Sequence, residues 1–565
     1  MSFLDDIFAQ LEAATSGMLV LWELHEQVAQ QEVSWGVWGD GLLKRVAEAR
    51  AFLRAQHLNK GDRCALLAHN SIEWVAMDLA IMAEGLIVVP LYARQAVPEL
   101  VSMMKDCSPV FICCGDETLR DGIAQNWAEA PPQYLFGEIF GAASRGATSQ
   151  VGGAAPHNHP VALEDSDAVT IIYTSGTSGD AKGVVLNAGN VAHMLACTSG
   201  RLDALMDSKS QQDRVFHYLP FCFAGSWIML MTCLMRRSLL ILNTDLSKLA
   251  SDMPSSAPDY FLNVPALLER MRKAVDEQLS KTGGVALSVY SRAKSAWLRT
   301  QEKQGSLMDS VWLGLANVAV FPTIRKKMMG PNLKALICGS APLNIETQLY
   351  FMMLGIPVLQ VYGLTETTAI CTMDDPRHVE PGRVGPAIDG IEMKLGENEE
   401  IIVRGPNIFP GYWNRPAETA KVLHDGWFHT GDQGEVDTRG NWRIIGRIKN
   451  LIILGSGHNI PPEPIEEELL KNIVGAQQVV LMGNGRGYLS AIVTGNVSRE
   501  AVQEAIDELN PTLPHYKQVR AFYVSPEAFS IENGLLTANG KLKRDLIAAR
   551  MKAQIEDMYR VKQAS

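Results

Sequence analysis

Two kinds of hydrophobic pattern alternate through the first third of the chain. Residues 41–57 repeat apolar positions at helical spacing, whereas several shorter runs are apolar throughout and predict buried strands. Strands that alternate with helices favour parallel sheets covered by helices on both faces, so this region predicts a doubly wound α/β fold. The predicted strands are residues 63–68, 86–91, 110–114 and 168–173.

The same alternation continues into the second half of the chain. Helical patterns dominate residues 280–330, and apolar strands follow at 333–338 and 357–361. Residues 143–160 are small, polar and rich in Gly and Pro, so they predict a surface loop. We therefore expect one large N-terminal domain that is built around doubly wound sheets.

Short strands and turn signals replace this pattern from about residue 383, which predicts a β-rich subdomain over about residues 383–446. The segment after Arg447 has strands and helices of its own and is long enough for a separate small α+β domain. We therefore predict an N-terminal domain at 1–448 and a C-terminal domain at 449–565. The short strands are expected at 391–395, 400–403, 434–436 and 442–445.

Composition excludes several classes of protein. The net charge of −11 disfavours a nucleic-acid partner, because phosphate binding needs a surplus of Lys and Arg. The longest apolar run, 227–234, is much shorter than the roughly 20 residues that cross a bilayer, so at most we expect peripheral membrane contact. Nine cysteines without CxxC spacing and an acidic N-terminus predict reduced core cysteines and a cytoplasmic location.

A loop with the composition of a phosphate site follows the strand at 168–173. Residues 173–183 read YTSGTSGDAKG, in which glycines allow backbone N–H groups to approach an anion while hydroxyls and a lysine add donors and charge. The loop is not a Walker A motif, because Gly183 stands where Ser or Thr would follow the lysine. A flexible surface turn is the alternative for such a composition. The candidate phosphate-binding residues are Thr174, Ser175, Gly176, Thr177, Ser178, Gly179 and Lys182.

Five further blocks accompany this loop in a fixed order. Together with it they resemble the adenylate-forming superfamily, which comprises acyl- and aryl-CoA synthetases, peptide-synthetase adenylation domains and firefly luciferase. Six blocks in order leave little room for coincidence. The further blocks are ALICGSAPL (335–343), VYGLTETT (361–368), GWFHTGD (426–432), GRIKNL (446–451) and TANGKLKR (537–544).

The resemblance implies a nucleotide site. Tyr362 would stack on adenine, Thr365 would contact the α-phosphate, and Glu366 would hold Mg²⁺, which screens the charge of ATP. Asp432 and Arg447 would bind the ribose. The further residues that the resemblance assigns to ATP or AMP are Gly339, Ser340, Ala341 and Gly363.

The resemblance also implies two chemical steps. A carboxylate first attacks the α-phosphorus of ATP and forms acyl-AMP, with Lys541 bridging the reacting oxygens. A thiol, which we expect to belong to coenzyme A, then displaces AMP. Between the steps the mobile C-terminal domain would swing about Lys449, which brings the loop of Gly455, Ser456 and Gly457 to the thiol tunnel.

Four sites, five residues in all, depart from the pattern of the superfamily. Ala181 replaces a usual Pro before Lys182, Asn187-Ala188 replaces a Thr-His pair, and Pro464 replaces a common Glu. Phe223 stands where His or another aromatic residue is common, so it keeps the shape without a polar contact.

The acyl group is expected beside the helix that follows Phe223. No Asp or Glu stands in this run to pair an amino-acid ammonium, so a fatty or aromatic carboxylic acid is favoured. The insertion at 280–330 resembles that of bacterial long-chain fatty acyl-CoA synthetases, which favours a medium- or long-chain acid. The cluster at 325–327 would contact acidic lipid or the phosphates of the coenzyme, or be a solvated helix end. The predicted lining residues are Phe223, Ala224, Trp227 and Met231.

Three alternatives stay open. The thiol could belong to the phosphopantetheine arm of a carrier protein, or the acid could be aromatic. A non-catalytic relative should have lost its charged residues, yet those of every block are present, so we expect an active ligase. The sequence leaves the oligomeric state, monomer or homodimer, undecided.

Overall fold

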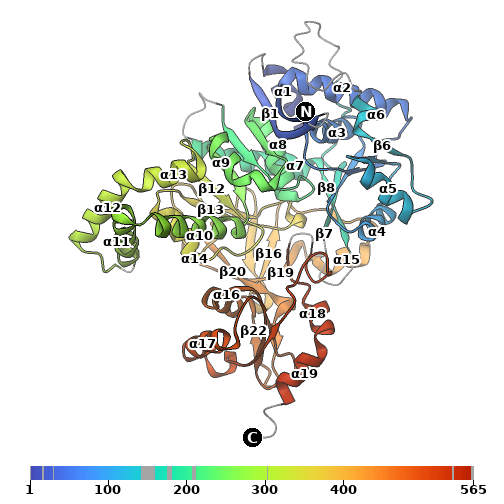
Figure 1. Cartoon of the computed structure of the whole chain (residues 1–565). Coiled ribbons are helices and arrows are strands. Elements are labelled where there is room, and N and C mark those ends of the chain that lie inside the picture. The colour runs from blue at the N-terminus through green and yellow to red at the C-terminus, as the bar shows by residue number, and fades with distance from the viewer. Residues whose placement is uncertain are drawn as a thin grey trace.

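The computed structural model describes residues 2–14, 18–28, 31–140, 159–174, 181–206, 212–301, 303–537 and 540–560. A large domain carries a projecting helical arm on one side, and a small C-terminal domain lies below it (Figure 1). Most of the loop predicted at 143–160, and the residues 175–180 of the phosphate loop, lie outside the described residues.

One sheet of the large domain has the strand order β17-β8-β7-β4-β3-β5-β6. Its central strands are parallel, and only β8 and β17 run antiparallel to their neighbours. The predicted apolar runs at 63–68, 86–91, 110–114 and 168–173 all lie in this sheet. Its strands are β3 (Arg63–Leu67), β4 (Ile87–Leu91), β5 (Phe111–Cys114), β6 (Gln133–Leu135), β7 (Ala168–Thr174), β8 (Lys182–Asn187) and β17 (Gly411–Tyr412).

A second sheet has the order β14-β13-β12-β11-β9-β10-β1-β2 and is also mixed, because its two edge pairs are antiparallel. The hairpin of β1 and β2 was not predicted from the sequence. The strands are β1 (Leu19–Val28), β2 (Gln31–Trp38), β9 (Arg214–His217), β10 (Leu239–Asn243), β11 (Tyr260–Asn263), β12 (Ala335–Cys338), β13 (Val358–Tyr362) and β14 (Thr372–Met373).

Buried helices fill the space between these two sheets. All twelve residues of α3 (Ile72–Ala83) are buried, and α3 contacts β3 and β4 of one sheet and β1 of the other. The helix α8 (Ala224–Arg236) buries nine residues and packs against α1 (Phe3–Ala13) and α7 (Ala188–Met206). The helix α2 (Gly39–Ala55) packs on α1 and α3 in the same core. Other helices cover the outer faces, among them α4 (Val97–Cys107), α5 (Glu117–Asn126), α9 (Leu249–Ser256), α10 (Pro265–Thr282) and α14 (Ile345–Met353).

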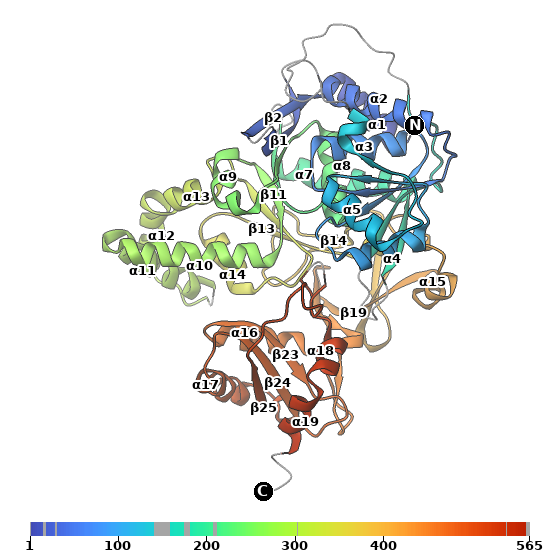
Figure 2. The same ribbon diagram turned by 45° about the vertical axis from the view of Figure 1, so that its right-hand side comes forward.

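A small β-rich sheet connects the large domain to the C-terminal domain. It contains β15 (Glu392–Leu395), β16 (Glu400–Arg404), β18 (Leu423–His424), β19 (Trp427–Val436) and β20 (Trp442–Arg447). The C-terminal domain has its own hydrophobic core and a three-stranded sheet. Figure 2 shows it as a separate body below the large domain. Its main elements are α16 (Glu463–Asn472), β23 (Ala476–Met482), β24 (Leu489–Gly495), α17 (Arg499–Leu509), β25 (Val519–Ser525), α18 (Arg544–Arg550) and α19 (Lys552–Arg560).

This architecture confirms the predicted fold class, an α/β chain with a large N-terminal domain and a small C-terminal domain. All nine cysteines are free, and eight of them are buried. The division at residues 448 and 449 stays a prediction, although the turn η5 (Ile448–Asn450) lies directly after the last strand of the β-rich sheet.

Candidate active site

A cavity of about 2480 Å³ lies where the two large sheets, the β-rich sheet and the C-terminal domain meet. Residues from every described block of the sequence pattern line it, although they are separated by up to several hundred positions in the chain. The lining includes Thr174, Lys182, Gly339, Ser340, Ala341, Tyr362, Gly363, Thr365, Glu366, Asp432, Arg447, Lys449 and Lys541.

Asp432 is the buried centre of one wall. The register of the antiparallel pair β19–β20 places Arg447 directly opposite Asp432, and the Arg447 Nε lies 2.6 Å from the Asp432 Oδ1. The Tyr362 hydroxyl donates a hydrogen bond of 2.7 Å to the Asp432 Oδ2. Burial raises the pKa of Asp432, although Arg447 acts in the opposite direction. Asp432 is thus held rigidly by two partners from different strands.

Glu366 faces the same cavity from the short 3-10 helix η3 (Thr365–Thr367). Its Oε1 accepts a hydrogen bond of 2.8 Å from the Tyr412 hydroxyl. Burial and then the Glu366 carboxylate raise the pKa of Tyr412, so the phenol remains protonated and donates. A single oriented carboxylate of this kind fits Mg²⁺, which proteins commonly bind through one or two carboxylates together with substrate phosphates.

Lys182 begins β8, and it pairs in register with Thr174 at the end of β7. Its Nζ lies 2.9 Å from the Glu418 Oε2 and 4.9 Å from the centre of the Tyr412 ring. Hydrogen bonds from Lys421 and Lys182 lower the pKa of Glu418 to about 2. The side chain of Lys182 is therefore oriented at the cavity wall. The remaining residues predicted for this loop, Ser175, Gly176, Thr177, Ser178 and Gly179, lie outside the described residues.

Two glycines are required by close packing beside the cavity. A Cβ on Gly339 would lie 2.6 Å from the Cγ2 of Val361, and a Cβ on Gly363 would lie 2.2 Å from the carbonyl oxygen of Ala369. Neither position accepts a side chain without movement of its neighbours. Ser340 follows Gly339 with a φ of 72°, which exposes its side chain on the cavity side.

Lys541 reaches the cavity from the C-terminal domain. It lies in a turn closed by the bridge between Leu536 and Leu542, and its backbone N–H donates 3.1 Å to the Thr537 Oγ1. The side chain is open to the cavity yet surrounded by protein on most sides, so the loss of solvation, followed by the charge of Arg447, lowers its pKa.

The cations of the cavity repel one another. The pKa of Lys449 is also lowered, first by the loss of solvation and then by the charge of Arg447, with a smaller effect of Lys182. Arg447, Lys449, Lys182 and Lys541 therefore converge on a region where Asp432 and Glu366 supply too little negative charge. An anionic group such as a triphosphate would relieve this repulsion, and a site of this kind attracts such a ligand.

The C-terminal domain is docked so that Lys541 lies at the cavity, and ion pairs hold this domain against the large one. Lys471 of α16 forms an ion pair with Glu346 of α14, and the Lys543 Nζ lies 3.5 Å from the Glu99 Oε1 of α4. The predicted thiol-tunnel residues Gly455, Ser456 and Gly457 are exposed and do not line the cavity in this arrangement. Their role, and that of Lys449 as hinge, remain predictions about a second arrangement.

Two of the four residues predicted to line the acyl pocket do not line the cavity. Phe223 and Ala224 line the cavity, but Trp227 and Met231 are wholly buried on the opposite face of α8. The Trp227 indole N–H donates a hydrogen bond of 3.1 Å to Asp78 Oδ2 of α3, and this contact lies on the buried face of the helix together with Leu230 and Met231. The residues of α8 that line the cavity instead are Gly225, Ser226, Ile228, Met229 and Thr232.

A helical spacing of three and four residues counted from Gly225 identifies Ile228, Met229 and Thr232 as one face. The sequence alone does not distinguish this face from the face that carries Trp227, because neither contains a charged residue. From α7, Thr198 and Leu202 complete this part of the cavity.

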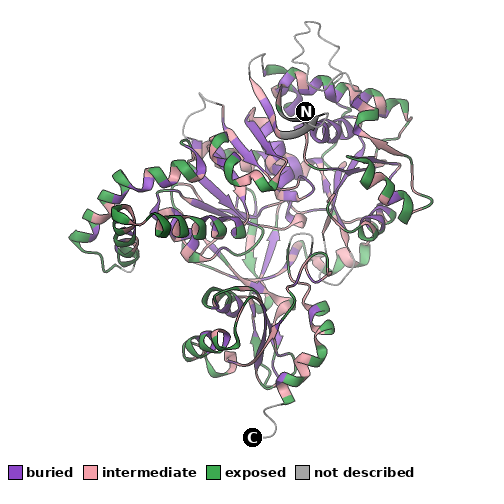
Figure 3. Ribbon diagram, in the orientation of Figure 1, coloured by how far each residue is buried: buried purple, intermediate pink, exposed green. Residues whose placement is uncertain are grey.

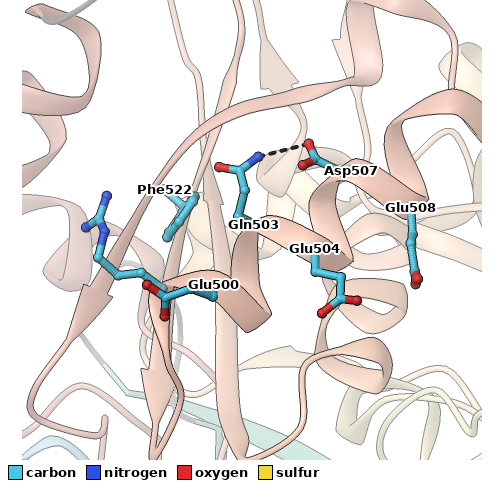
Figure 4. Close-up of a pocket in the computed structure, with 7 residues that line it drawn as sticks. Glu500, Gln503, Glu504, Asp507, Glu508 and Phe522 are labelled. Atoms are coloured by element: carbon cyan, nitrogen blue, oxygen red, sulfur yellow. Dashed lines mark hydrogen bonds between the residues drawn. The ribbon is translucent and has the colours of Figure 1, made fainter.

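A second hollow lies on the surface of the C-terminal domain, along α17 (Figure 4). Its lining is dominated by carboxylates, and the Gln503 Nε2 donates 2.9 Å to the Asp507 Oδ1. Carboxylates repel an anionic nucleotide, so the central cavity is the better candidate. The lining residues are Arg499, Glu500, Gln503, Glu504, Asp507, Glu508 and Phe522.

Comparison with known proteins identifies the family of the chain. The family model "AMP-binding enzyme" matches residues 40–413, and the model "AMP-binding enzyme C-terminal domain" matches residues 449–563. The chain belongs to the AMP-binding enzyme family. The resemblance drawn from the six sequence blocks is thereby confirmed, and the protein is an adenylate-forming enzyme of the acid–thiol ligase class.

Individual relatives are distant. The long-chain-fatty-acid–CoA ligase FadD15 of Mycobacterium tuberculosis is 24% identical over 94% of each chain. The long-chain-fatty-acid–[acyl-carrier-protein] ligase AEE15 of Arabidopsis thaliana is 26% identical over 90% of this chain and 80% of its own. The solved structure of ATP-bound MatB from Rhodopseudomonas palustris has a TM-score of 0.72 at 24% identity, covering 98% of this chain and 99% of that chain. The o-succinylbenzoate CoA synthetase MenE of Bacillus subtilis, bound to its acyl-adenylate, has a TM-score of 0.72 at 20% identity, with coverage of 96% and 97%.

Proposed function

We propose that the protein activates a medium- or long-chain fatty acid with ATP and Mg²⁺, and transfers the acyl group to coenzyme A. The observation that carries the choice of acid is the apolar branch of the cavity between α7 and α8. Gly225, Ile228, Met229 and Thr232 span about two helical turns, or about 10 Å along α8. None of them is charged. The one hydroxyl among them, that of Thr232, is already engaged within the protein, because it donates 2.7 Å to the Ile228 carbonyl oxygen and lies 2.8 Å from the Thr198 Oγ1.

In the first step the fatty carboxylate attacks the α-phosphorus of ATP, and pyrophosphate leaves. The protein contributes orientation and positive charge more than covalent chemistry. Lys541 would lie between the carboxylate and the α-phosphate oxygens, and Lys182 would face the departing phosphates. Asp432 accepts hydrogen bonds from the ribose hydroxyls in this proposal, and Tyr362 lies beside the base.

Glu366 and the phosphates of ATP would hold Mg²⁺, which supplies charge neutralisation of the phosphate oxygens when it is bound. Tyr412 orients the Glu366 carboxylate through its hydrogen bond of 2.8 Å. Thr365, next to Glu366 in η3, lines the cavity and would donate to an α-phosphate oxygen.

In the second step a thiol attacks the acyl carbonyl, a C–S bond forms, and AMP leaves with its oxygen. Coenzyme A and the phosphopantetheine arm of a carrier protein present the same thiol. The names of the relatives include both acceptors, since FadD15 is named as a CoA ligase and AEE15 as an acyl-carrier-protein ligase. We propose coenzyme A because most of the similar curated proteins are named as CoA ligases or CoA synthetases. The nine free cysteines support a reducing compartment, and we place the protein in the cytoplasm.

The test is ATP–pyrophosphate exchange across saturated fatty acids from butyrate to stearate, with benzoate and o-succinylbenzoate included, followed by thioester detection after addition of coenzyme A. Exchange that peaks with a medium- or long-chain acid and yields thioester is the expected result. Exchange with only the aromatic acids would overturn the choice of acid. Exchange with a fatty acid that yields thioester only on a phosphopantetheinylated carrier protein would overturn the choice of acceptor.

A further inference from the structure

A helical arm projects from the large domain, away from the active-site cavity. It comprises α11 (Gly284–Gln301), α12 (Leu307–Ala319) and α13 (Phe321–Met329), and we use the name helical arm for residues 284–329. Both views show α11 and α12 extending outward from the body (Figures 1 and 2). The arm is held together internally, because α11 packs on α12 and α12 on α13.

The inner face of α12 packs against the rest of the arm, whereas its outer face is exposed to solvent. Ala316 is buried, and the inner Asp309 is buried as well, where it caps the helix through Ser306 and forms an ion pair with Arg299. Asp309 is the only charged residue of α12. The exposed surface of this helix therefore carries no charge, which is unusual for a surface helix of a protein in which 20% of residues are charged.

The outer face is a continuous apolar stripe. Its residues follow the spacing of one helix face, and Figure 3 shows the arm as largely exposed. Leu307 is 89% exposed and Val318 is 82% exposed, values that are far from those of a core residue. A contiguous exposed patch of several large apolar side chains marks a contact with a partner or a membrane. The stripe consists of Leu307, Met308, Val311, Leu315 and Val318.

The charge of the arm is opposite to that of the protein. Residues 284–329 contain seven basic and two acidic residues, whereas the whole chain has a net charge of −11. Lys326 and Lys327 are exposed at the end of α13, and Lys303 is exposed in the turn before α12. The exposed Arg292 lies over the ring of Trp312 at 4.5 Å, which keeps a cation beside the apolar stripe.

An apolar stripe on an arm with a surplus of Lys and Arg matches the interface of an anionic bilayer, in which apolar groups enter the acyl boundary and cations meet the phosphates. A second copy of the chain is a poorer occupant, since two arms with the same positive surplus would repel. Among the described helices, no single one is long and apolar enough to span a membrane. The pair α12 and α13 meets those criteria of length and composition jointly, but it is bent by 44°.

We propose that the outer face of the helical arm docks this protein on the surface of an anionic lipid bilayer. The stripe on α12 would lie in the plane of the interface, with Lys326 and Lys327 against the headgroups. This inference rests on the arm alone and does not depend on the choice of acid in the proposed function.

The experiment is flotation of the full chain with vesicles of phosphatidylcholine that contain one third phosphatidylglycerol, compared with vesicles of phosphatidylcholine alone. We expect binding to the anionic vesicles that weakens as salt is raised. The double variant Val311→Glu, Val318→Glu and the double variant Lys326→Glu, Lys327→Glu should each reduce the bound fraction about tenfold. The control is Val474→Glu, because Val474 is 86% exposed but lies in the C-terminal domain, and it should bind as the wild type does.

Each variant must retain wild-type adenylation in solution, which shows that the arm substitutions leave the fold and the site intact. Absence of binding to anionic vesicles at low salt, or equal binding by the Val311→Glu, Val318→Glu variant, would overturn the proposal. A wild-type dimer in solution that this variant converts to a monomer, without vesicle binding, would instead make the stripe an interface between copies.

Discussion

Lys471 of the C-terminal domain forms an ion pair with Glu346 of the large domain, and Glu346 also accepts a hydrogen bond of 3.1 Å from Arg272 of α10. The hydrogen bond to Glu346 raises the pKa of Lys471, although burial acts in the opposite direction. The pair joins the two domains in the arrangement that places Lys541 at the cavity. If Lys541 serves adenylation as we propose, the pair stabilises the state that this step uses and has no role in the chemistry itself.

Loss of this ion pair should therefore affect the two half-reactions unequally. We expect Lys471→Ala to slow ATP–pyrophosphate exchange about two- to fivefold, the range expected for a partly exposed ion pair. Thioester formation from preformed acyl-AMP should be unchanged or faster, because we propose that this step uses another arrangement of the domains. Lys471→Arg keeps the charge and should behave as the wild type. Equal slowing of both half-reactions by Lys471→Ala would contradict this interpretation.

Lys541 is expected to serve only the first half-reaction. Lys541→Ala should reduce ATP–pyrophosphate exchange about 10²- to 10³-fold, as is typical for loss of a group that stabilises transition-state charge. Thioester formation from preformed acyl-AMP should stay within about threefold of the wild type. Lys552→Ala, an exposed position on α19, is the control. If both half-reactions of Lys541→Ala stay near the wild type, the assignment of Lys541 is wrong.

The pH profile of adenylation follows from the same residue. In the proposed role Lys541 must be protonated to neutralise the reacting oxygens, and burial together with the charge of Arg447 lowers its pKa. The rate should therefore decline on the alkaline side at a lower pH than the ordinary pKa of lysine would require. Arg447→Gln removes the neighbouring charge, so this decline should shift to higher pH. An unchanged alkaline limb in Arg447→Gln would argue against this coupling.

The two faces of α8 predict two different phenotypes. Met229 lines the cavity, so Met229→Trp should shift the preferred fatty acid to a shorter chain in the exchange assay, by filling the apolar branch. Trp227→Phe should leave the chain-length preference unchanged, and should destabilise the protein by about 1–3 kcal/mol because Asp78 loses its hydrogen-bond donor. A changed preference in Trp227→Phe would reverse our assignment of the two faces.

Asp78 makes stability depend on pH. Burial raises its pKa to about 8, although the hydrogen bond from Trp227 acts in the opposite direction. Between about pH 4 and pH 8 the unfolded chain releases a proton that the folded chain retains, so this group costs increasing stability as the pH rises through that window. Asp78→Asn stays neutral throughout and should show a smaller fall in Tm between pH 5 and pH 8 in thermal unfolding. Glu12→Gln, an exposed change on α1, should retain the wild-type pH dependence.

Local sequence was sufficient for the predicted core strands and for most of the candidate site. The apolar run at 63–68 became β3, and the periodic segment at 41–57 became α2, because burial of such runs satisfies both backbone hydrogen bonding and the hydrophobic effect. Gly339 and Gly363 stand where a side chain would collide with Val361 and Ala369, so the same positions that marked the sequence blocks are those at which the backbone approaches closely.

What the sequence by itself determined is thus the class of enzyme, the alternation of strands and helices, and the residue types that the chemistry needs. Tertiary structure alone decided which residues from distant parts of the chain lie close together. The buried face of α8 is set by its packing against distant segments, among them Asp78, which lies 149 positions from Trp227, and the approach of Lys541 to Asp432 depends on how a separate domain docks. The apolar stripe on α12 is likewise recognised as exposed only once the packing of α11 is known. Periodicity identifies the faces of a helix, but contacts between distant segments determine which face is buried.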